Sequence, residues 1–144
     1  MIVYCDSSVL LKRVFDEADA AEFRSHFQDL IDGGSALATS ALGELEVSRV
    51  CRRYFGDDGL RDARAALEDI AILAVSRAVL RNAAEIPYRH LRSADAIHVA
   101  SAFTLRADLV LTRDRQMRIA CEQVGIQVAW APHPTDLLVK SGLE

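Results

Sequence analysis

The sequence predicts an α/β fold in which helices cover both faces of a parallel sheet. Five short apolar runs have the composition of strands buried in such a sheet. They are residues 1–5, 36–39, 70–75, 109–112 and 126–129. Helical patterns separate these runs, so consecutive strands can pair in parallel through helical crossovers. In open sheets of this class, ligands bind at the carboxyl ends of the strands.

The helices between the strands are predicted from apolar spacing and from residues suited to helix ends. In the segment 16–30, Phe23 and Phe27 recur at helical spacing. Ser40 and Ser93 are suited to N-cap the helices that follow them. The predicted helices cover residues 9–15, 16–30, 41–55, 60–69, 76–85 and 94–105, and a last helix ends at Gly125.

Several positions within these elements are predicted to lie in the core. Val79 and Leu80 are expected to be buried in the helix over 76–85. Cys5, Cys51 and Cys121 each fall within an apolar pattern and have no C-x-x-C spacing. We therefore interpret them as core residues, not as metal ligands or a disulfide framework.

Length and composition predict one globular domain over residues 1–144. Hydrophobic residues make up 51% and charged residues 26% of the chain, as in globular proteins. The apolar start is too short for a signal peptide, and no run approaches the roughly 20 apolar residues of a membrane span. We expect a cytoplasmic protein with no membrane partner.

The net charge of -4 gives no overall attraction to nucleic acid. The basic residues are nearly all arginine, however, and arginine is suited to bidentate phosphate contacts.

Asp6 and Asp114 follow apolar strand runs, which places both carboxylates at the edge of the sheet where ligands bind. Each can also N-cap the next helix, and that structural role is the alternative for both. Asp95 lies in a small, apolar helical segment, so we expect packed surroundings there. In the first turn of a helix, its charge is favoured by the helix dipole.

Glu44 and Glu46 are two residues apart on one predicted helix and so point in different directions. Glu46 shares an i, i+4 row with Leu42 and Val50, whereas Glu44 shares one with Ser40. We therefore predict that Glu46 faces inward and Glu44 faces solvent. A solvated surface position is the alternative for either glutamate.

Four carboxylates that converge at one edge would repel one another and raise their pKa values unless a cation neutralised them. Oxygen ligands without a His or Cys cluster favour Mg²⁺ or Mn²⁺ over Zn²⁺. His98 lies about one turn beyond Asp95. It can reach this site or simply pack within its helix.

The segments that carry these acids resemble the PIN-domain ribonucleases, and among them the VapC-type toxins of type II toxin–antitoxin systems. Those segments are residues 4–12, 39–46, 91–98 and 111–114. Any one motif is weak, but four in this order are specific. The resemblance assigns the catalytic and metal-binding quartet to Asp6, Glu46, Asp95 and Asp114, with Ser8 and Thr112 as supporting residues.

The resemblance also implies a fold and an activity. The implied fold is a three-layer α/β/α PIN-like domain with a central parallel sheet of about five strands. The implied activity is an Mg²⁺-dependent endoribonuclease, with Mn²⁺ as the other candidate metal, that hydrolyses RNA phosphodiester bonds. The implied partners are RNA, a neutralising VapB-type antitoxin and a second copy of the chain, with a higher assembly formed with the antitoxin.

Arginines near the acids are candidates to hold RNA phosphates, with surface solubility or intramolecular pairing as the alternative. They are Arg49, Arg53, Arg92, Arg113 and Arg115.

Two other functions are weighed against the ribonuclease. A non-catalytic PIN-like module that binds RNA or protein would share its motifs. A receiver-like signalling domain would need an Asp after the third strand and a Lys after the fifth. The chain has Ser76 at the first place and Trp130-Ala131 at the second, which counts against a receiver.

Overall fold

The structure, a computed structural model, describes residues 1–129 of the chain. Its strands are β1 (Ile2–Cys5), β2 (Ala36–Ser40), β3 (Ile70–Leu73), β4 (Leu109–Leu111) and β5 (Gln127–Ala129). Its helices are α1 (Ser7–Leu11), α2 (Ala20–Asp32), α3 (Ala41–Phe55), the 3-10 turn η1 (Gly56–Asp58), α4 (Gly59–Ala66), α5 (Arg77–Ala84), α6 (Ser93–Thr104) and α7 (Arg115–Gln123).

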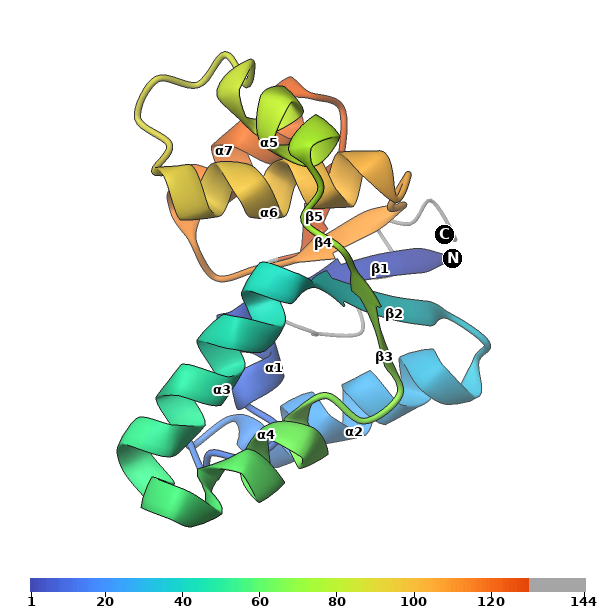
Figure 1. Cartoon of the computed structure of the whole chain (residues 1–144). Helices are drawn as coiled ribbons and strands as arrows, with labels where there is room; N and C mark the ends of the chain where they lie inside the picture. The colour runs from blue at the N-terminus through green and yellow to red at the C-terminus, as the bar shows by residue number, and fades with distance from the viewer. Residues whose placement is uncertain (130–144) are drawn as a thin grey trace.

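The strands of this part of the chain form one parallel sheet in the order β3-β2-β1-β4-β5. Helices α1 to α4 cover one face, and α5 to α7 cover the other, as Figure 1 shows. The predicted three-layer α/β/α architecture with a five-stranded sheet is therefore confirmed.

Alternate residues of the central strand β1 supply the two halves of the core. Val3 and Cys5 pack among the residues of α1 to α4, including Phe27. Tyr4 points to the opposite face, where it joins the cluster that contains Val99 of α6. This alternation follows from the two-residue period of a strand, and it directs the Tyr4 side chain toward α6.

The strand order fixes where a ligand can bind. The chain first adds β2 and β3 on one side of β1, and then β4 and β5 on the other. The switch between these two directions lies between β1 and β4, and ligands of such sheets bind at the carboxyl ends of the strands beside it.

The strand order also argues against the receiver alternative, because receiver-like domains have the order β2-β1-β3-β4-β5. Trp130 and Ala131, which stand where a receiver would need its Lys, lie outside the described residues.

The predicted helix boundaries were wrong at the start of the chain. The first helix is Ser7–Leu11 instead of 9–15, and the second begins at Ala20 instead of residue 16. The carboxylates of Glu17 and Asp19 both accept hydrogen bonds from the ammonium group of Lys12. These bonds hold the segment before α2 as a loop.

Other details also differ from the prediction. Leu80 is 46% exposed, although Val79 beside it is buried as predicted. Ser93 is the first residue of α6 and not its cap; Arg92 occupies the N-cap position and makes no side-chain capping bond. The predicted helix over 60–69 ends at Ala66, and Asp69, just before β3, has a left-handed φ of 61°.

The cysteine prediction is confirmed, because Cys5, Cys51 and Cys121 are free and buried. None of the helices within residues 1–129 is long and apolar enough to cross a membrane.

Candidate active site

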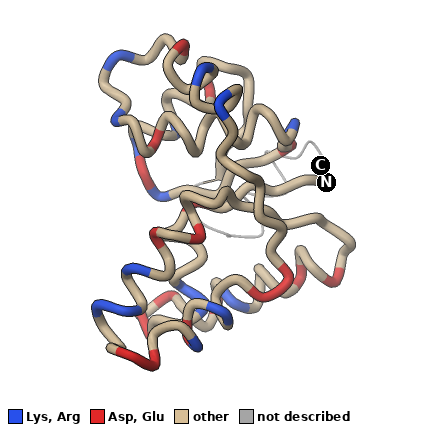
Figure 2. The backbone as a smooth tube through the Cα atoms, viewed as in Figure 1, with Lys and Arg blue, Asp and Glu red and all other residues tan. Residues whose placement is uncertain are grey.

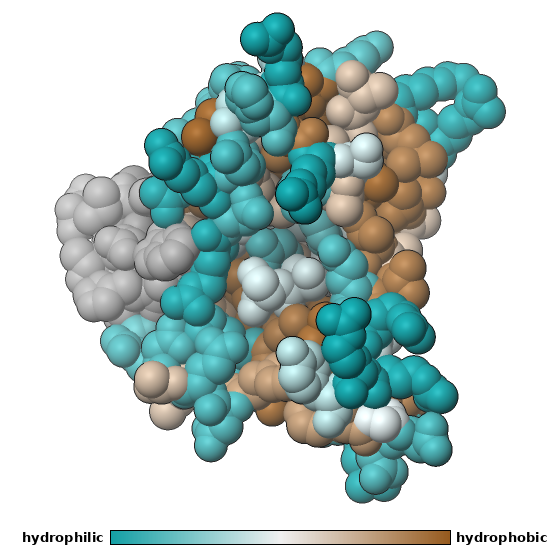
Figure 3. Space-filling view, turned by 90° about the vertical axis from the view of Figure 1, so that its left-hand side faces the viewer, coloured by the Kyte–Doolittle hydropathy of each residue, from teal (hydrophilic) through white to brown (hydrophobic). Residues whose placement is uncertain are grey.

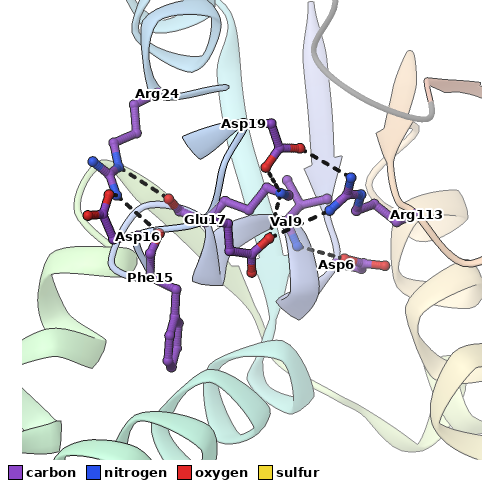
Figure 4. Close-up of polar contacts among 9 residues, drawn as sticks. Asp6, Val9, Phe15, Asp16, Glu17, Asp19, Arg24 and Arg113 are labelled. Atoms are coloured by element: carbon purple, nitrogen blue, oxygen red, sulfur yellow. Dashed lines mark hydrogen bonds and ion pairs between the residues drawn. The ribbon is translucent and has the colours of Figure 1, made fainter. Parts of the chain in front are cut away.

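Asp6 lies directly after β1, and only 4% of its surface is exposed. Its Oδ1 accepts hydrogen bonds from the Ser8 hydroxyl at 2.6 Å and from the backbone N–H of Val9 at 3.1 Å. Figure 4 draws the bond to Val9. Its Oδ2 accepts a hydrogen bond from the hydroxyl of Thr112. Asp6 therefore caps α1 and also stands at the switch point of the sheet, so one carboxylate satisfies both interpretations of the sequence.

Asp114 stands beside Asp6 at the end of the neighbouring strand. Its Oδ1 caps α7 by accepting the backbone N–H of Met117 at 2.9 Å. Its own backbone N–H donates to the Thr112 hydroxyl at 3.0 Å. Thr112 is buried and thus links the two acids, while the Asp114 side chain faces solvent.

The two glutamates of α3 lie as their helical rows predict. Glu44 is exposed, whereas Glu46 is partly buried and turns toward α6. Glu46 Oε1 is 2.5 Å from Nε2 of His98, and Nδ1 of His98 is 2.6 Å from the hydroxyl of Tyr4. Glu46 is thereby joined to α6, the helix that carries Asp95.

Asp95 lies in the first turn of α6 and is partly buried. Burial raises its pKa, the carboxylates of Asp114, Glu46 and Asp6 raise it further, and His98 partly offsets this. Within residues 1–129, its side chain makes no hydrogen bond or ion pair. The charges of the other three acids thus act on Asp95, and no donor from the described part of the chain bonds its carboxylate.

The donor chemistry of this edge fits a hard divalent cation, since the charges of the other three acids act on the Asp95 carboxylate. Burial is the largest cause of the raised pKa of Asp95, and the neighbouring carboxylates raise it further. Among the described residues, however, no group of three or more His, Cys, Asp or Glu side chains is arranged to hold a metal ion as it stands. Asp6 and Glu46 are instead engaged by protein donors.

Figure 3 looks onto this edge and shows hydrophilic side chains around a recess between the two helical layers. Figure 2 shows acidic positions reaching the same edge from both layers, with basic positions beside them. Arg49, Arg53, Arg92 and Arg115 are exposed, and within residues 1–129 their side chains make no hydrogen bond or ion pair. Arg115 and Arg118 line a second recess together with Arg113.

Arg113 is held by acids of the chain itself (Figure 4). Its guanidinium is 3.2 Å from Asp19 and 3.8 Å from Glu17. The buried ammonium of Lys12 contacts the same two carboxylates, at 2.5 Å and 2.9 Å. The bond from Lys12 lowers the pKa of Asp19. This four-residue network ties the loop before α2 to the segment between β4 and α7, next to Asp114.

Sequence reasoning missed Tyr4, Lys12, Glu17 and Asp19 as neighbours of the site. Lys12 carried a signal, because it is one of only two lysines and lies within the first motif. Tyr4 carried none, since a tyrosine in an apolar run is also typical of a core strand.

Comparison with known proteins identifies the class to which this fold and site belong. The family model of the PIN domain matches residues 3–123. The chain therefore belongs to the PIN domain family.

Within that family, the chain is a relative of the VapC ribonucleases. Ribonuclease VapC47 of Mycobacterium tuberculosis (strain CDC 1551 / Oshkosh) is 33% identical over 130 residues, which cover 89% of this chain and 96% of the relative. Ribonuclease VapC46 of Mycobacterium tuberculosis (strain ATCC 25618 / H37Rv) is 31% identical over 128 residues, covering 88% and 95%. The resemblance seen in the motifs is thus confirmed.

Solved structures share the fold at much lower sequence identity. VapBC2 from Rickettsia felis, bound to a DNA fragment from its promoter, matches with a TM-score of 0.70 and 11% identity, covering 90% of this chain and 98% of that chain. Mycobacterium tuberculosis VapC20, a toxin that cleaves the sarcin-ricin loop, matches with a TM-score of 0.62 and 16% identity, covering 86% and 95%.

Proposed function

We propose that this protein is a VapC-type, divalent-metal-dependent endoribonuclease that acts as one domain over residues 1–144. The observation that carries the proposal is the placement of Asp6 and Asp114 at the ends of neighbouring strands, where both bond the hydroxyl of Thr112. The charges of both acids also act on Asp95. Relatives that are named ribonucleases and align over nearly their whole length support it.

In this proposal Asp6, Asp95 and Asp114 hold Mg²⁺ or Mn²⁺, and Glu46 completes the site directly or through water. A bound metal would supply an attacking water of lowered pKa, polarise the phosphate and stabilise the leaving oxygen. The chain contributes the positions of its carboxylates. Asp6 is fixed by its three hydrogen bonds, and Asp95 remains free of protein donors in residues 1–129.

The RNA backbone is proposed to contact the exposed arginines around the acids, Arg49, Arg53, Arg92 and Arg115. Phosphate contacts of this kind position a nucleic acid without reading its sequence. Arg113 is the weakest of the five candidates, because Asp19 and Glu17 already engage its guanidinium.

The proposed partner is a VapB-type antitoxin, and the proposed assembly is a homodimer that enters a larger complex with it in the cytoplasm. Solved complexes such as VapBC-1 from nontypeable Haemophilus influenzae support this choice through the shared fold. An arginine of the antitoxin could pair with the site's carboxylates in place of a metal.

Expression of this chain alone in bacteria tests the proposal. We expect growth arrest from the wild type, relief by Asp6→Asn, and relief by co-expression of the neighbouring open reading frame through a stable complex. Glu44→Gln is the matched control and should remain toxic, since Glu44 is exposed on the opposite row of α3. Harmless wild-type expression at verified soluble levels would favour the non-catalytic binding module instead.

A further inference from the structure

His98 is buried, with 2% of its surface exposed, and both of its ring nitrogens make hydrogen bonds. Nε2 lies 2.5 Å from Oε1 of Glu46, and Nδ1 lies 2.6 Å from the hydroxyl of Tyr4. The Tyr4 ring also packs edge-on against the imidazole, with centroids 5.8 Å apart. Three side chains from β1, α6 and α3 therefore form one connected chain of hydrogen bonds.

The direction of these bonds follows from the donor inventory. An ionised carboxylate only accepts hydrogen bonds, so Nε2 must carry the hydrogen that joins it to Glu46. In a neutral ring, Nδ1 is then an acceptor, and the Tyr4 hydroxyl can fill it. With Glu46 ionised and the His98 ring neutral, Tyr4 O–H donates to Nδ1, and Nε2–H donates to Glu46.

We infer that His98 is a positioning residue that holds the Glu46 carboxylate at the site, and that Tyr4 fixes the tautomer in which it does so. This inference rests on the proposed function, because ordering Glu46 matters for activity only if Glu46 helps to bind the metal. His98 and Asp95 are three residues apart on α6 and so share one side of that helix. The same helix therefore presents one acid of the quartet and orients another.

Such an arrangement has a physical benefit for Glu46. A glutamate on a partly exposed helix position samples many rotamers, and ordering it on ligand binding costs conformational entropy. The bond from His98 orders the side chain beforehand. Outer residues that orient ligands in this way typically change metal affinity by about 10- to 100-fold when they are removed.

The alternative is a purely structural bond that fastens α6 to α3. The two roles are distinguished by measuring Mn²⁺ affinity of the full-length protein by calorimetry, with the melting temperature recorded for every variant. We expect His98→Leu to weaken Mn²⁺ binding about 10- to 100-fold. His98→Gln, whose amide can still donate to Glu46, should lose at most a few-fold. Tyr4→Phe should fall between them, because it frees the ring to change tautomer.

A double-mutant cycle with Glu46→Ala makes the test specific. If His98 acts through Glu46, adding His98→Leu to Glu46→Ala should not weaken Mn²⁺ binding further. Equal losses in both backgrounds, or a lower melting temperature with unchanged affinity in His98→Leu, would overturn the inference.

The ring itself gives a readout that does not depend on activity or on metal. Side-chain ¹⁵N NMR of the metal-free protein should show hydrogen on Nε2 of His98, and Tyr4→Phe should perturb that pattern. Hydrogen on Nδ1 alone in the wild type would overturn the inference. If the wild type neither binds Mn²⁺ nor cleaves RNA, the proposed function fails, whereas the NMR result still decides whether the Tyr4–His98–Glu46 link exists.

Discussion

The hydroxyl of Thr112 donates a hydrogen bond to Oδ2 of Asp6, and so joins the ends of the neighbouring strands β1 and β4. The same hydroxyl accepts the backbone N–H of Asp114 at 3.0 Å. The buried Thr112 therefore fixes the positions of Asp6 and Asp114 relative to each other.

Thr112→Val should destabilise the protein by about 1–3 kcal/mol, because it leaves a buried oxygen of Asp6 without its donor. It should also lower RNA cleavage, since Asp6 and Asp114 lose their common anchor. Thr104→Val is the matched control. Among residues 1–129, the Thr104 hydroxyl bonds only the Ala100 carbonyl of its own helix, and its loss should cost about 0.5 kcal/mol or less. Urea unfolding measures the free energy of unfolding of both variants. Equal stability of the two variants would contradict the proposed anchor.

Asp95→Asn should raise the melting temperature of the metal-free protein at neutral pH. The folded-state pKa of Asp95 is raised above its ordinary value of 3.8, first by burial and then by the other acids. The folded chain thus binds the proton more tightly than the unfolded chain, and stability falls as pH rises through the window between these two pKa values. Asparagine does not titrate, so Asp95→Asn should not lose folding stability in this pH range.

Melting curves at several pH values, in a chelator, check this prediction, with Glu44→Gln as the exposed control. Added Mg²⁺ or Mn²⁺ should then stabilise the wild type by binding linkage and stabilise Asp95→Asn less. An identical metal response in wild type and Asp95→Asn would argue against a metal at this acid.

Lys12→Met should lower the melting temperature, because the buried ammonium joins Glu17 and Asp19 (Figure 4). Arg52→Met is the control, since Arg52 and Asp57 form an exposed ion pair at 3.4 Å, and such pairs contribute little to stability.

The effect of Lys12→Met should also depend on pH. The pKa of Asp19 is lowered in the folded protein, so the stability that Asp19 contributes is present above the ordinary pKa of an aspartate and is lost as pH falls through the lowered value. The difference between wild type and Lys12→Met should therefore narrow in strong acid. A difference that persists there would assign the effect to packing of the lysine stem.

Glu46→Gln should reduce RNA cleavage by about 10- to 100-fold, because Glu46 is the glutamate that faces the site. Glu44→Gln should leave the rate near that of the wild type, since its side chain is exposed. Initial rates on one labelled RNA compare the two. The reverse ranking would show that the helical rows of α3 do not decide which glutamate acts.

The sequence predicted the parts of this fold that depend on local pattern. Apolar runs predicted the five strands, and the helical rows of α3 predicted that Glu46 faces inward and Glu44 faces solvent. The predicted boundaries were wrong where side-chain ion pairs override the local helical preference. Residues 16–19 have a helical pattern, but ion pairs with the buried Lys12 and the partly exposed Arg113 hold Glu17 and Asp19 in a loop. The bond between Tyr4 and His98 spans 94 positions, a distance over which a sequence pattern carries no signal.

The most direct test of the ribonuclease proposal is cleavage of an end-labelled RNA by the purified chain, with and without divalent metal. We predict cleavage in Mg²⁺ or Mn²⁺, none in a chelator, recovery when metal is restored, and loss in Asp95→Asn at a melting temperature no lower than that of the wild type. Cleavage that persists in the chelator, or that Asp95→Asn retains in full, would contradict the assignment of these carboxylates as a metal-dependent catalytic site.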